Sequence, residues 1–391
     1  MLQVTDWNPT AGGVETYVRD LCPALRAAGM TVRVLTSSAG TAMDGSADFA
    51  AWGTSNRLSQ AGLQLVNPFA WTRMRAALRR FRPEVVHVHS FAYHLSPAVV
   101  FAAQRMPVVI TIHDYKPICP LGTKLLPDGR LCEERAGMVC FRSGCVSLPQ
   151  LMREHVRYRL IARALAHGKV LLVGTESMRR ALGREGIRCE VVGYPVTPPA
   201  PDFARRPAEH PTFLYCGRLA PEKGVGLLLR AFARIVGELP RLRLRLIGDG
   251  PERARLQRLA SDLGVAEAVS FAGWQPRGEV DRSMAEAWAL VAPSLWAEPF
   301  GLVAPEAIMR GLPVVASAAG GLAETVVDGV SGLKFPVGDE SALRRCMAAI
   351  ARRTAFSTHA VEADVVAAVR AAHAPERHVE QLREIYLRAA A

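Results

Sequence analysis

The chain lacks long apolar segments and is poor in lysine. No unbroken apolar run reaches the roughly 18 residues that a membrane-spanning helix needs, so we expect no transmembrane segment. The first residues lack the basic, apolar and small-residue order of a signal peptide, so we expect a cytoplasmic protein. No basic stretch carries the interleaved aromatic residues or zinc-finger spacing of nucleic-acid-binding proteins, so we expect no nucleic-acid partner.

The size and charge of the chain favour two domains with different surfaces. It has 391 residues, of which half are apolar and a fifth charged, more than one ordinary core accommodates. Of the net charge of +12, residues 1–195 carry +10, from 24 Lys and Arg against 14 Asp and Glu. This charge favours an anionic acceptor, a nucleotide or a lipid surface. A general bias toward arginine is the alternative explanation, because only five of the 48 basic residues are lysine.

Short apolar runs alternate with amphipathic stretches along the whole chain, which predicts a parallel α/β architecture covered on both faces. Between the first two runs, residues 14–28 have helical spacing and end at Gly29. We predict strands at residues 2–6, 30–36, 85–89, 108–112, 170–173, 190–192, 212–216, 243–247, 269–271, 290–292 and 313–317.

A proline-rich stretch divides the two halves. Residues 193–207 contain five prolines, which cannot continue a helix or a central strand, so we place a linker near residues 196–210. The predicted units are therefore an N-terminal domain over 1–195 with an insertion at 115–150, a second domain over 196–374, and a C-terminal helix over 375–391.

The most informative motif has two glutamates eight residues apart, Glu298 and Glu306, around a Phe-Gly-Leu turn. Pro305 is tolerated only near the start of a helix, so a helix should begin around Leu302 or Val303. Carboxylates accept hydrogen bonds from paired sugar hydroxyls, so Glu298 can hold a hexose and Glu306 a ribose. The alternative is that Glu306 complements the helix dipole while Glu298 is a solvated loop acid.

This motif resembles the E-x7-E signature of the retaining GT-B glycosyltransferases of family 4, and the similarity covers nearly the whole chain. The resemblance implies two Rossmann-like, doubly wound domains facing each other across a cleft, with the closing helix packed back on the N-terminal domain. It also implies transfer of a hexose from a nucleotide diphosphate sugar, a UDP- or GDP-sugar, to a hydroxyl acceptor.

A second motif follows the first strand of the second domain, where Arg218 and Lys223 lie five residues apart. A planar guanidinium and a flexible ammonium together can clamp a diphosphate and stabilise the charge that grows on the leaving phosphate. No cofactor and no catalytic metal is then required. Alone the motif is weak, and a solvated loop is the alternative.

Two further positions come from the first domain. Gly12 and Gly13 at the start of the first helix allow close approach of the backbone to a phosphate. His113 follows a predicted strand, and the resemblance implies that it contacts the donor sugar and stabilises cationic character through its carbonyl. The alternative is a buried structural histidine bonded to Asp114.

Other loops at strand ends complete the predicted donor site. Trp274 can stack on the nucleobase or belong to the core, and the sequence does not decide between them. The amides of the Phe-Gly-Leu turn would read the sugar hydroxyls. The donor-binding set adds Gly248, Asp249, Gly250, Trp274, Gln275, Phe300, Gly301 and Leu302 to the residues above.

Four cysteines cluster in the insertion: Cys119, Cys132, Cys140 and Cys145. A structural zinc would fit four thiolates that clamp a weakly hydrophobic segment. The spacing lacks a C-x2-C knuckle, so reduced thiols and disulfides remain alternatives.

The basic stretch over 150–169 leaves peripheral membrane contact open, with a solvated helix face as the alternative. The acceptor stays undetermined among natural-product, polysaccharide and lipid-linked hydroxyls, as does the oligomeric state. A non-catalytic nucleotide-sugar or glycan binding subunit on the same scaffold is the alternative function. A phosphorylase or an epimerase is disfavoured, because the lysine or catalytic carboxylates that each needs have no obvious counterparts.

Overall fold

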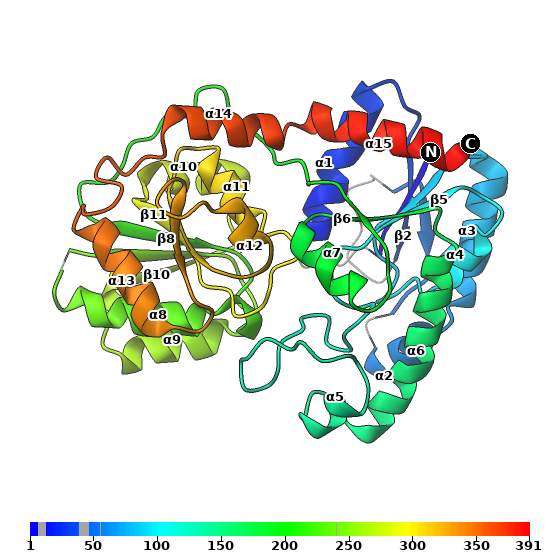
Figure 1. Ribbon diagram of the computed structural model, residues 1–391, viewed down its shortest axis with the longest axis horizontal. Helices are drawn as coiled ribbons and strands as arrows, with labels where there is room; N and C mark the ends of the chain where they lie inside the picture. The colour runs from blue at the N-terminus through cyan, green and yellow to red at the C-terminus, as the bar shows by residue number, and fades with distance from the viewer. Residues whose placement is uncertain (7–12, 39–46, 55, 240) are drawn as a thin grey trace. The chain divides into compact units, whose positions relative to one another are not determined.

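The computed structural model describes residues 1–6, 13–38, 47–54, 56–239 and 241–391 (Figure 1). The chain divides into two compact units. Unit 1 comprises residues 1–123, 133–195 and 375–391, and unit 2 comprises residues 124–132 and 196–374. Apart from the short segment 124–132, the chain therefore leaves unit 1 after residue 195 and returns to it at residue 375.

Unit 1 contains a parallel sheet whose strand order in the described residues is β3-β2-β1-β4-β5-β6-β7. The strands are β1 (Leu2–Val4), β2 (Arg33–Ser37), β3 (Phe49–Ala51), β4 (Val86–Val88), β5 (Val108–Thr111), β6 (Val170–Val173) and β7 (Glu190–Val191). The helices are α1 (Gly13–Ala27), α2 (Arg57–Leu63), α3 (Pro68–Phe81), α4 (Ala98–Ala102), α5 (Met138–Arg142), α6 (Leu148–Ala166), α7 (Glu176–Gly183) and α15 (Pro375–Ala390).

Unit 2 contains a second parallel sheet, with the order β10-β9-β8-β11-β12-β13. The strands are β8 (Thr212–Cys216), β9 (Arg243–Ile247), β10 (Val269–Gly273), β11 (Ala289–Ala292), β12 (Val314–Ser317) and β13 (Gly332–Phe335). The helices are α8 (Val225–Val236), α9 (Arg253–Asp262), α10 (Arg277–Glu286), α11 (Val303–Ile308), α12 (Gly320–Thr325), α13 (Glu340–Ala351) and α14 (Ala363–Ala372), with short 3-10 turns η1 (Pro221–Lys223) and η2 (Ala266–Ala268).

Helices cover both faces of the unit 2 sheet, as the apolar strands predicted. Phe213 and Leu214 are neighbours in β8, so their side chains point to opposite faces, and both are fully buried. Phe213 belongs to the core cluster that contains residues of α8 and α13, whereas Leu214 belongs to the cluster that contains residues of α10 and α11. The predicted α/β fold with two Rossmann-like domains is confirmed.

The last helix, α15, returns to unit 1 and packs beside α1 (Figure 1). The Tyr17 hydroxyl lies 2.8 Å from Nε2 of His378, and the Tyr386 hydroxyl lies 2.7 Å from Nδ1 of His87 on β4. Among the described helices, none combines the length and the apolar character needed to cross a bilayer.

Candidate active site

The loops that follow the central strands of unit 2 pack against one another at the carboxyl edge of the sheet. From β8 the sequence order of the strands runs outward through β9 to β10 on one side, and from β11 it runs outward through β12 to β13 on the other. The boundary between β8 and β11 is therefore a switch point, where doubly wound sheets bind their ligands. A Cβ atom built on Gly248, after β9, would lie 1.9 Å from the carbonyl oxygen of Gly217, after β8. One built on Gly320 would lie 2.4 Å from the carbonyl oxygen of Glu298, after β11. The glycines thus let four loops converge on one place.

Lys223 is held in place by a short turn that only glycine can close. It ends η1, and the next residue, Gly224, has a φ of +69° and caps the N-terminus of α8. A Cβ on Gly224 would lie 1.9 Å from the carbonyl oxygen of Pro293, in the loop after β11. The Leu295 amide also donates to the carbonyl of Glu222, at 2.8 Å. The turn therefore brings Lys223 to the loop that carries Glu298.

Lys223 and Glu298 form an ion pair in which Nζ lies 2.7 Å from Oε1. The Ser294 hydroxyl donates to the same oxygen at 2.5 Å. Burial acts to raise the pKa of Glu298, but the charge of Lys223 and the hydrogen bonds from Lys223 and Ser294 outweigh it and lower the pKa. Glu298 is only 8% exposed, so the site contains a buried, ionised carboxylate beside an ammonium.

Arg218 lies on the same loop, four residues before its partner Glu222, and the Nη2–Oε1 distance is 2.5 Å. Its side chain is half exposed, whereas that of Glu222 is 14% exposed. A guanidinium has five N–H donors, so one such contact leaves it able to bind an anion as well.

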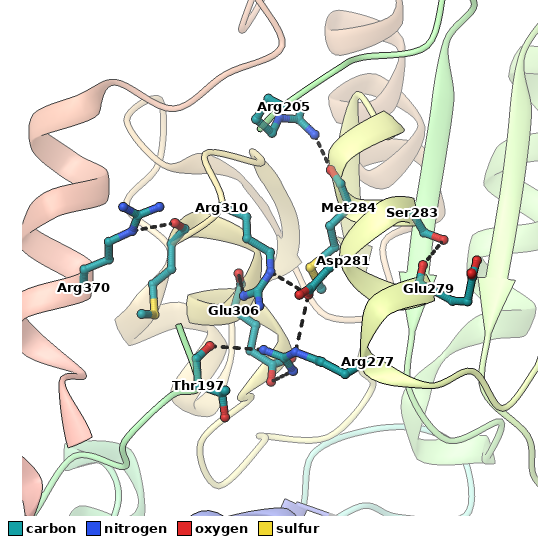
Figure 2. Close-up of polar contacts among 11 residues, drawn as sticks. Thr197, Arg205, Arg277, Glu279, Asp281, Ser283, Met284, Glu306, Arg310 and Arg370 are labelled. Atoms are coloured by element: carbon teal, nitrogen blue, oxygen red, sulfur yellow. Dashed lines mark hydrogen bonds and ion pairs between the residues drawn. The ribbon is translucent and has the colours of Figure 1, made fainter. Parts of the chain in front are cut away.

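Glu306, the second acid of the motif, lies in α11, which begins at Val303 as predicted. Its Oε1 lies 2.9 Å from Nη1 of Arg277, the first residue of α10 (Figure 2). The sequence did not predict this partner. It lies 29 residues away, and only the fold brings α10 and α11 together.

His113 lies in unit 1 and has both ring nitrogens within hydrogen-bonding distance of other side chains. The Tyr194 hydroxyl is 2.8 Å from Nδ1, and Nδ1 of His89 is 3.3 Å from Nε2. Oε1 of Gln3 lies 2.6 Å from Nε2 of His89 and accepts a hydrogen bond from it. His113 therefore donates to Nδ1 of His89 and accepts from the Tyr194 hydroxyl. Burial lowers the pKa of His113 to about 3, so the ring is neutral.

This geometry corrects the alternative role considered for His113. The ring is buried, but its partners are Tyr194 and His89. Asp114 instead accepts hydrogen bonds from the Tyr93 hydroxyl and the Lys116 amide. A contact between the His113 carbonyl and a donor sugar remains a prediction.

Comparison with known proteins assigns the family. Residues 200–359 match the family model described as glycosyl transferases group 1, and residues 11–198 match the glycosyltransferase family 4 model. The D-inositol 3-phosphate glycosyltransferase of Frankia alni is 30% identical over 352 residues, 83% of this chain and 82% of that protein. The chain belongs to the group 1 glycosyltransferases.

Solved structures show the same GT-B fold. The sucrose-phosphate synthase of Thermosynechococcus elongatus superposes with a TM-score of 0.76 at 23% identity, covering 100% of this glycosyltransferase and 99% of that chain. HepE of Anabaena, solved in complex with UDP and glucose, superposes with a TM-score of 0.70 at 19% identity, covering 98% of both chains.

The remaining predicted donor residues of the glycosyltransferase lie on the loops at the same edge of unit 2. Asp249 pairs with Arg253 at 3.0 Å. Trp274 is 67% exposed, so it does not belong to the core. The side-chain amide of Gln275 donates to the Ala272 carbonyl at 2.6 Å. The other members of the set lie on the loops after β9 and β11, at Gly248, Gly250, Phe300, Gly301 and Leu302.

Of the two glycines predicted to approach a phosphate, Gly12 and Gly13, the structure describes only Gly13. Gly13 is the first residue of α1, whereas Gly12 lies outside the described residues. The approach of this pair to a phosphate therefore stays a prediction.

The cysteines of the insertion give no support to the zinc alternative. Cys119 and Cys140 are buried, and Cys132 and Cys145 are half-buried. In the part of the chain that the structure describes, no three His, Cys, Asp or Glu side chains gather as a metal site would require.

Sequence reasoning missed several polar residues around the two glutamates. Ser294 lies four residues before Glu298 and hydrogen-bonds to it. Arg277 and Asp281 are one helical turn apart, as are Glu306 and Arg310. Opposite charges four residues apart were visible in the sequence at both places, within α10 and at the end of α11. Their contact with the predicted site was not visible, because it joins two helices.

Proposed function

We propose that this glycosyltransferase is a retaining enzyme that moves a hexose from a UDP- or GDP-sugar to a hydroxyl acceptor. The observation that carries the proposal is the buried Lys223–Glu298 pair at the switch point of the unit 2 sheet. It supplies a cation for a diphosphate and an ionised carboxylate for sugar hydroxyls within 2.7 Å of each other.

In the proposed reaction, the bond between the anomeric carbon and the β-phosphate oxygen breaks, and an oxocarbenium-like centre forms. Lys223 and Arg218 stabilise the negative charge that grows on the departing diphosphate. The acceptor hydroxyl attacks the anomeric carbon from the face that the phosphate leaves, and its proton passes to the phosphate. The anomeric configuration is therefore retained, and no metal ion is part of the proposal.

The two glutamates position the donor. Glu298 is proposed to accept hydrogen bonds from the hexose and Glu306 from the nucleoside ribose, while the Phe300–Leu302 amides contact the sugar. His113 is proposed to act through its carbonyl and Gly13 through its amide.

The acceptor is proposed to be a small molecule, a glycan or a lipid-linked hydroxyl. Exposed apolar residues on α6 support peripheral contact with a membrane. Leu148, Met152 and Val156 are 47%, 69% and 48% exposed and follow one another at a spacing of four residues. They therefore lie on one face of the helix, and the exposed Arg159 and Arg163 continue that face.

Incubation of the purified chain with a panel of UDP- and GDP-sugars tests the proposal. A working donor site should release nucleoside diphosphate from one donor, by transfer or by slow hydrolysis. With an acceptor, proton NMR of the product should show the anomeric configuration of the donor. Nucleotide binding without turnover of any donor would favour the non-catalytic binding subunit, and inversion would overturn the retaining mechanism. Loss of turnover in a chelator, with the fold intact, would overturn metal independence.

A further inference from the structure

Arg277 is fixed by acceptors from three separate segments of unit 2 (Figure 2). Its Nη1 contacts Oε1 of Glu306 at 2.9 Å, and its Nη2 donates to the carbonyl of Thr197 at 3.1 Å. Its Nε lies 3.4 Å from Oδ1 of Asp281 on the same helix. The planar guanidinium therefore has each of its three nitrogens directed at a different acceptor, which leaves little freedom of rotation.

A second arginine, Arg310, contacts the main chain of Glu306. Nη1 of Arg310 donates to the main-chain carbonyl of Glu306 at 2.8 Å, and Nε donates to Oδ1 of Asp281 at 2.9 Å. The Arg310 side chain is fully buried. Asp281 thus lies between the two arginines, and Figure 2 shows the chain of contacts from Arg310 through Asp281 and Arg277 to Glu306.

The arrangement exceeds what the structure of α11 alone requires. This helix has six residues, and its own hydrogen bonds leave the rotamer of Glu306 undetermined. The Glu306 side chain is 15% exposed, so it is nearly buried yet still reachable from solvent. A carboxylate has two oxygens and about four acceptor positions. The contact with Arg277 holds Oε1, which restricts the orientation of the carboxylate while other acceptor positions remain for a ligand.

We propose that Arg277 is a positioning residue that orients Glu306 toward the ribose of the donor nucleotide, and that Asp281 and Arg310 hold Arg277 in place. This inference rests on the proposed function, because it assumes that Glu306 receives the ribose. Arg277 acts through Glu306, so its loss should weaken recognition of the ribose hydroxyls rather than the chemical step.

The test compares nucleotides that differ by one hydroxyl. UDP, GDP and their 2′-deoxy and 3′-deoxy forms are titrated into the full chain by calorimetry. A hydroxyl bound by an oriented carboxylate should cost about tenfold to a hundredfold in Kd when it is removed. In Arg277→Gln and Glu306→Gln this penalty should fall to within about threefold. The double variant should lose little more than either single variant, because the two residues act as a unit.

Arg282→Gln is the matched control. Arg282 lies on the same helix, pairs with Glu279 at 2.8 Å and is 65% exposed, away from Glu306. It should keep the full penalty. Arg277→Lys restores a single charge contact without the fork, so it should recover part of the discrimination. Asp281→Asn should also reduce the penalty, and it serves if the Arg277 variants fail to fold.

Each outcome decides between the claims. If neither UDP nor GDP binds the wild-type chain, the proposed function fails. If one binds but neither deoxy form is penalised, the assignment of Glu306 to the ribose fails, and the role of Arg277 with it. If the wild type discriminates and folded Arg277→Gln or Asp281→Asn discriminates equally, the positioning role is overturned and the cluster is structural. Tighter binding and sharper discrimination in Arg277→Gln would instead mean that Arg277 shields Glu306 from the ribose, which also overturns the proposal.

Discussion

At the scale of single residues, the Lys223–Glu298 ion pair shows how the fold stabilises two buried charges that a ligand can contact. An isolated buried carboxylate is costly, but here an ammonium and a hydroxyl within 2.7 Å satisfy it. Lys223 has three N–H donors and needs only one for Glu298. Lys223 can therefore donate a hydrogen bond to a phosphate while it keeps its ion pair with Glu298.

Replacing Lys223 with alanine should lower kcat/KM by roughly a hundredfold, which is about 3 kcal/mol of transition-state stabilisation. The variant lacks the fixed cation. Of the two partners of Glu298 described above, Lys223 and Ser294, only the Ser294 hydroxyl remains. Steady-state kinetics with the donor found in the panel measures the effect. Lys169→Ala, an exposed lysine of unit 1, is the control. If Lys223→Ala and Arg218→Ala both turn over at the wild-type rate, neither residue binds the diphosphate.

Two glycines that flank α8 give a second residue-scale prediction. Gly224→Ala should destabilise the chain by at least about 2 kcal/mol, because its φ is +69° and the new Cβ would meet the Pro293 carbonyl. Gly237, at the other end of α8, has a helical φ of −63° and nothing within 4 Å of a built Cβ. Gly237→Ala should therefore be neutral or stabilising by up to about 1 kcal/mol. Urea unfolding of both variants measures the difference, and equal losses would contradict the steric account.

At the scale of elements, the sequence predicted most strands of both sheets. The strands at Val170–Val173, Thr212–Cys216 and Arg243–Ile247 begin and end where expected, because each is a short segment made mainly of apolar residues. Two edge strands were not predicted. Phe49–Ala51 has three residues, and Gly332–Phe335 contains Gly and Lys, so neither shows a strong apolar pattern.

The contacts of the candidate site were harder to predict than the strands. The motif spacing placed Lys223 and Glu298 on loops after β8 and β11 but did not show that they touch. That contact depends on the order of strands in the sheet, which brings β8 beside β11, and on the close approach at Gly224. The Arg277–Glu306 contact likewise needs the packing of two helices.

The exposed face of α6 gives a prediction about membranes. The chain should bind vesicles of anionic phosphatidylglycerol more strongly than phosphatidylcholine vesicles, and added salt should weaken the binding. Between residues 135 and 169 the one acidic residue is Glu154, which is buried against Arg157. Met152→Asp should reduce co-sedimentation with the vesicles. Leu387→Asp, which changes an exposed apolar residue of α15, should not. Equal effects, or no binding at all, would leave α6 a solvated helix.

At the scale of the whole molecule, buried histidines tie unit 1 together. His87 lies on β4, and His89 and His113 follow the ends of the neighbouring strands β4 and β5. His378 joins them from α15 through Tyr17. Burial lowers the pKa of all four, to about 3 for His113 and about 4 for His378. The unfolded chain titrates these groups near 6.5. Between those values the unfolded state binds more protons, so stability falls as the pH falls.

Unfolding free energy should therefore drop between pH 6.5 and pH 4, by about 1.4 kcal/mol per pH unit for each histidine that stays neutral in the fold. Urea unfolding followed across this range measures the slope. In His378→Gln the amide can still donate to the Gly193 carbonyl and accept from Tyr17 but does not titrate, so the slope should become shallower. A wild-type stability that is constant down to pH 4 would contradict the neutral network.

The return of α15 to unit 1 has a consequence for how the protein is made. Residues 196–374 are synthesised after the first Rossmann-like sheet but before the helix that covers part of it. The apolar side chains of unit 1 that α15 contacts therefore stay uncovered while residues 196–374 leave the ribosome. A nascent chain stalled before residue 375 should expose the surface around Tyr17 to chaperones, and a separate peptide with the sequence of α15 should compete for that surface.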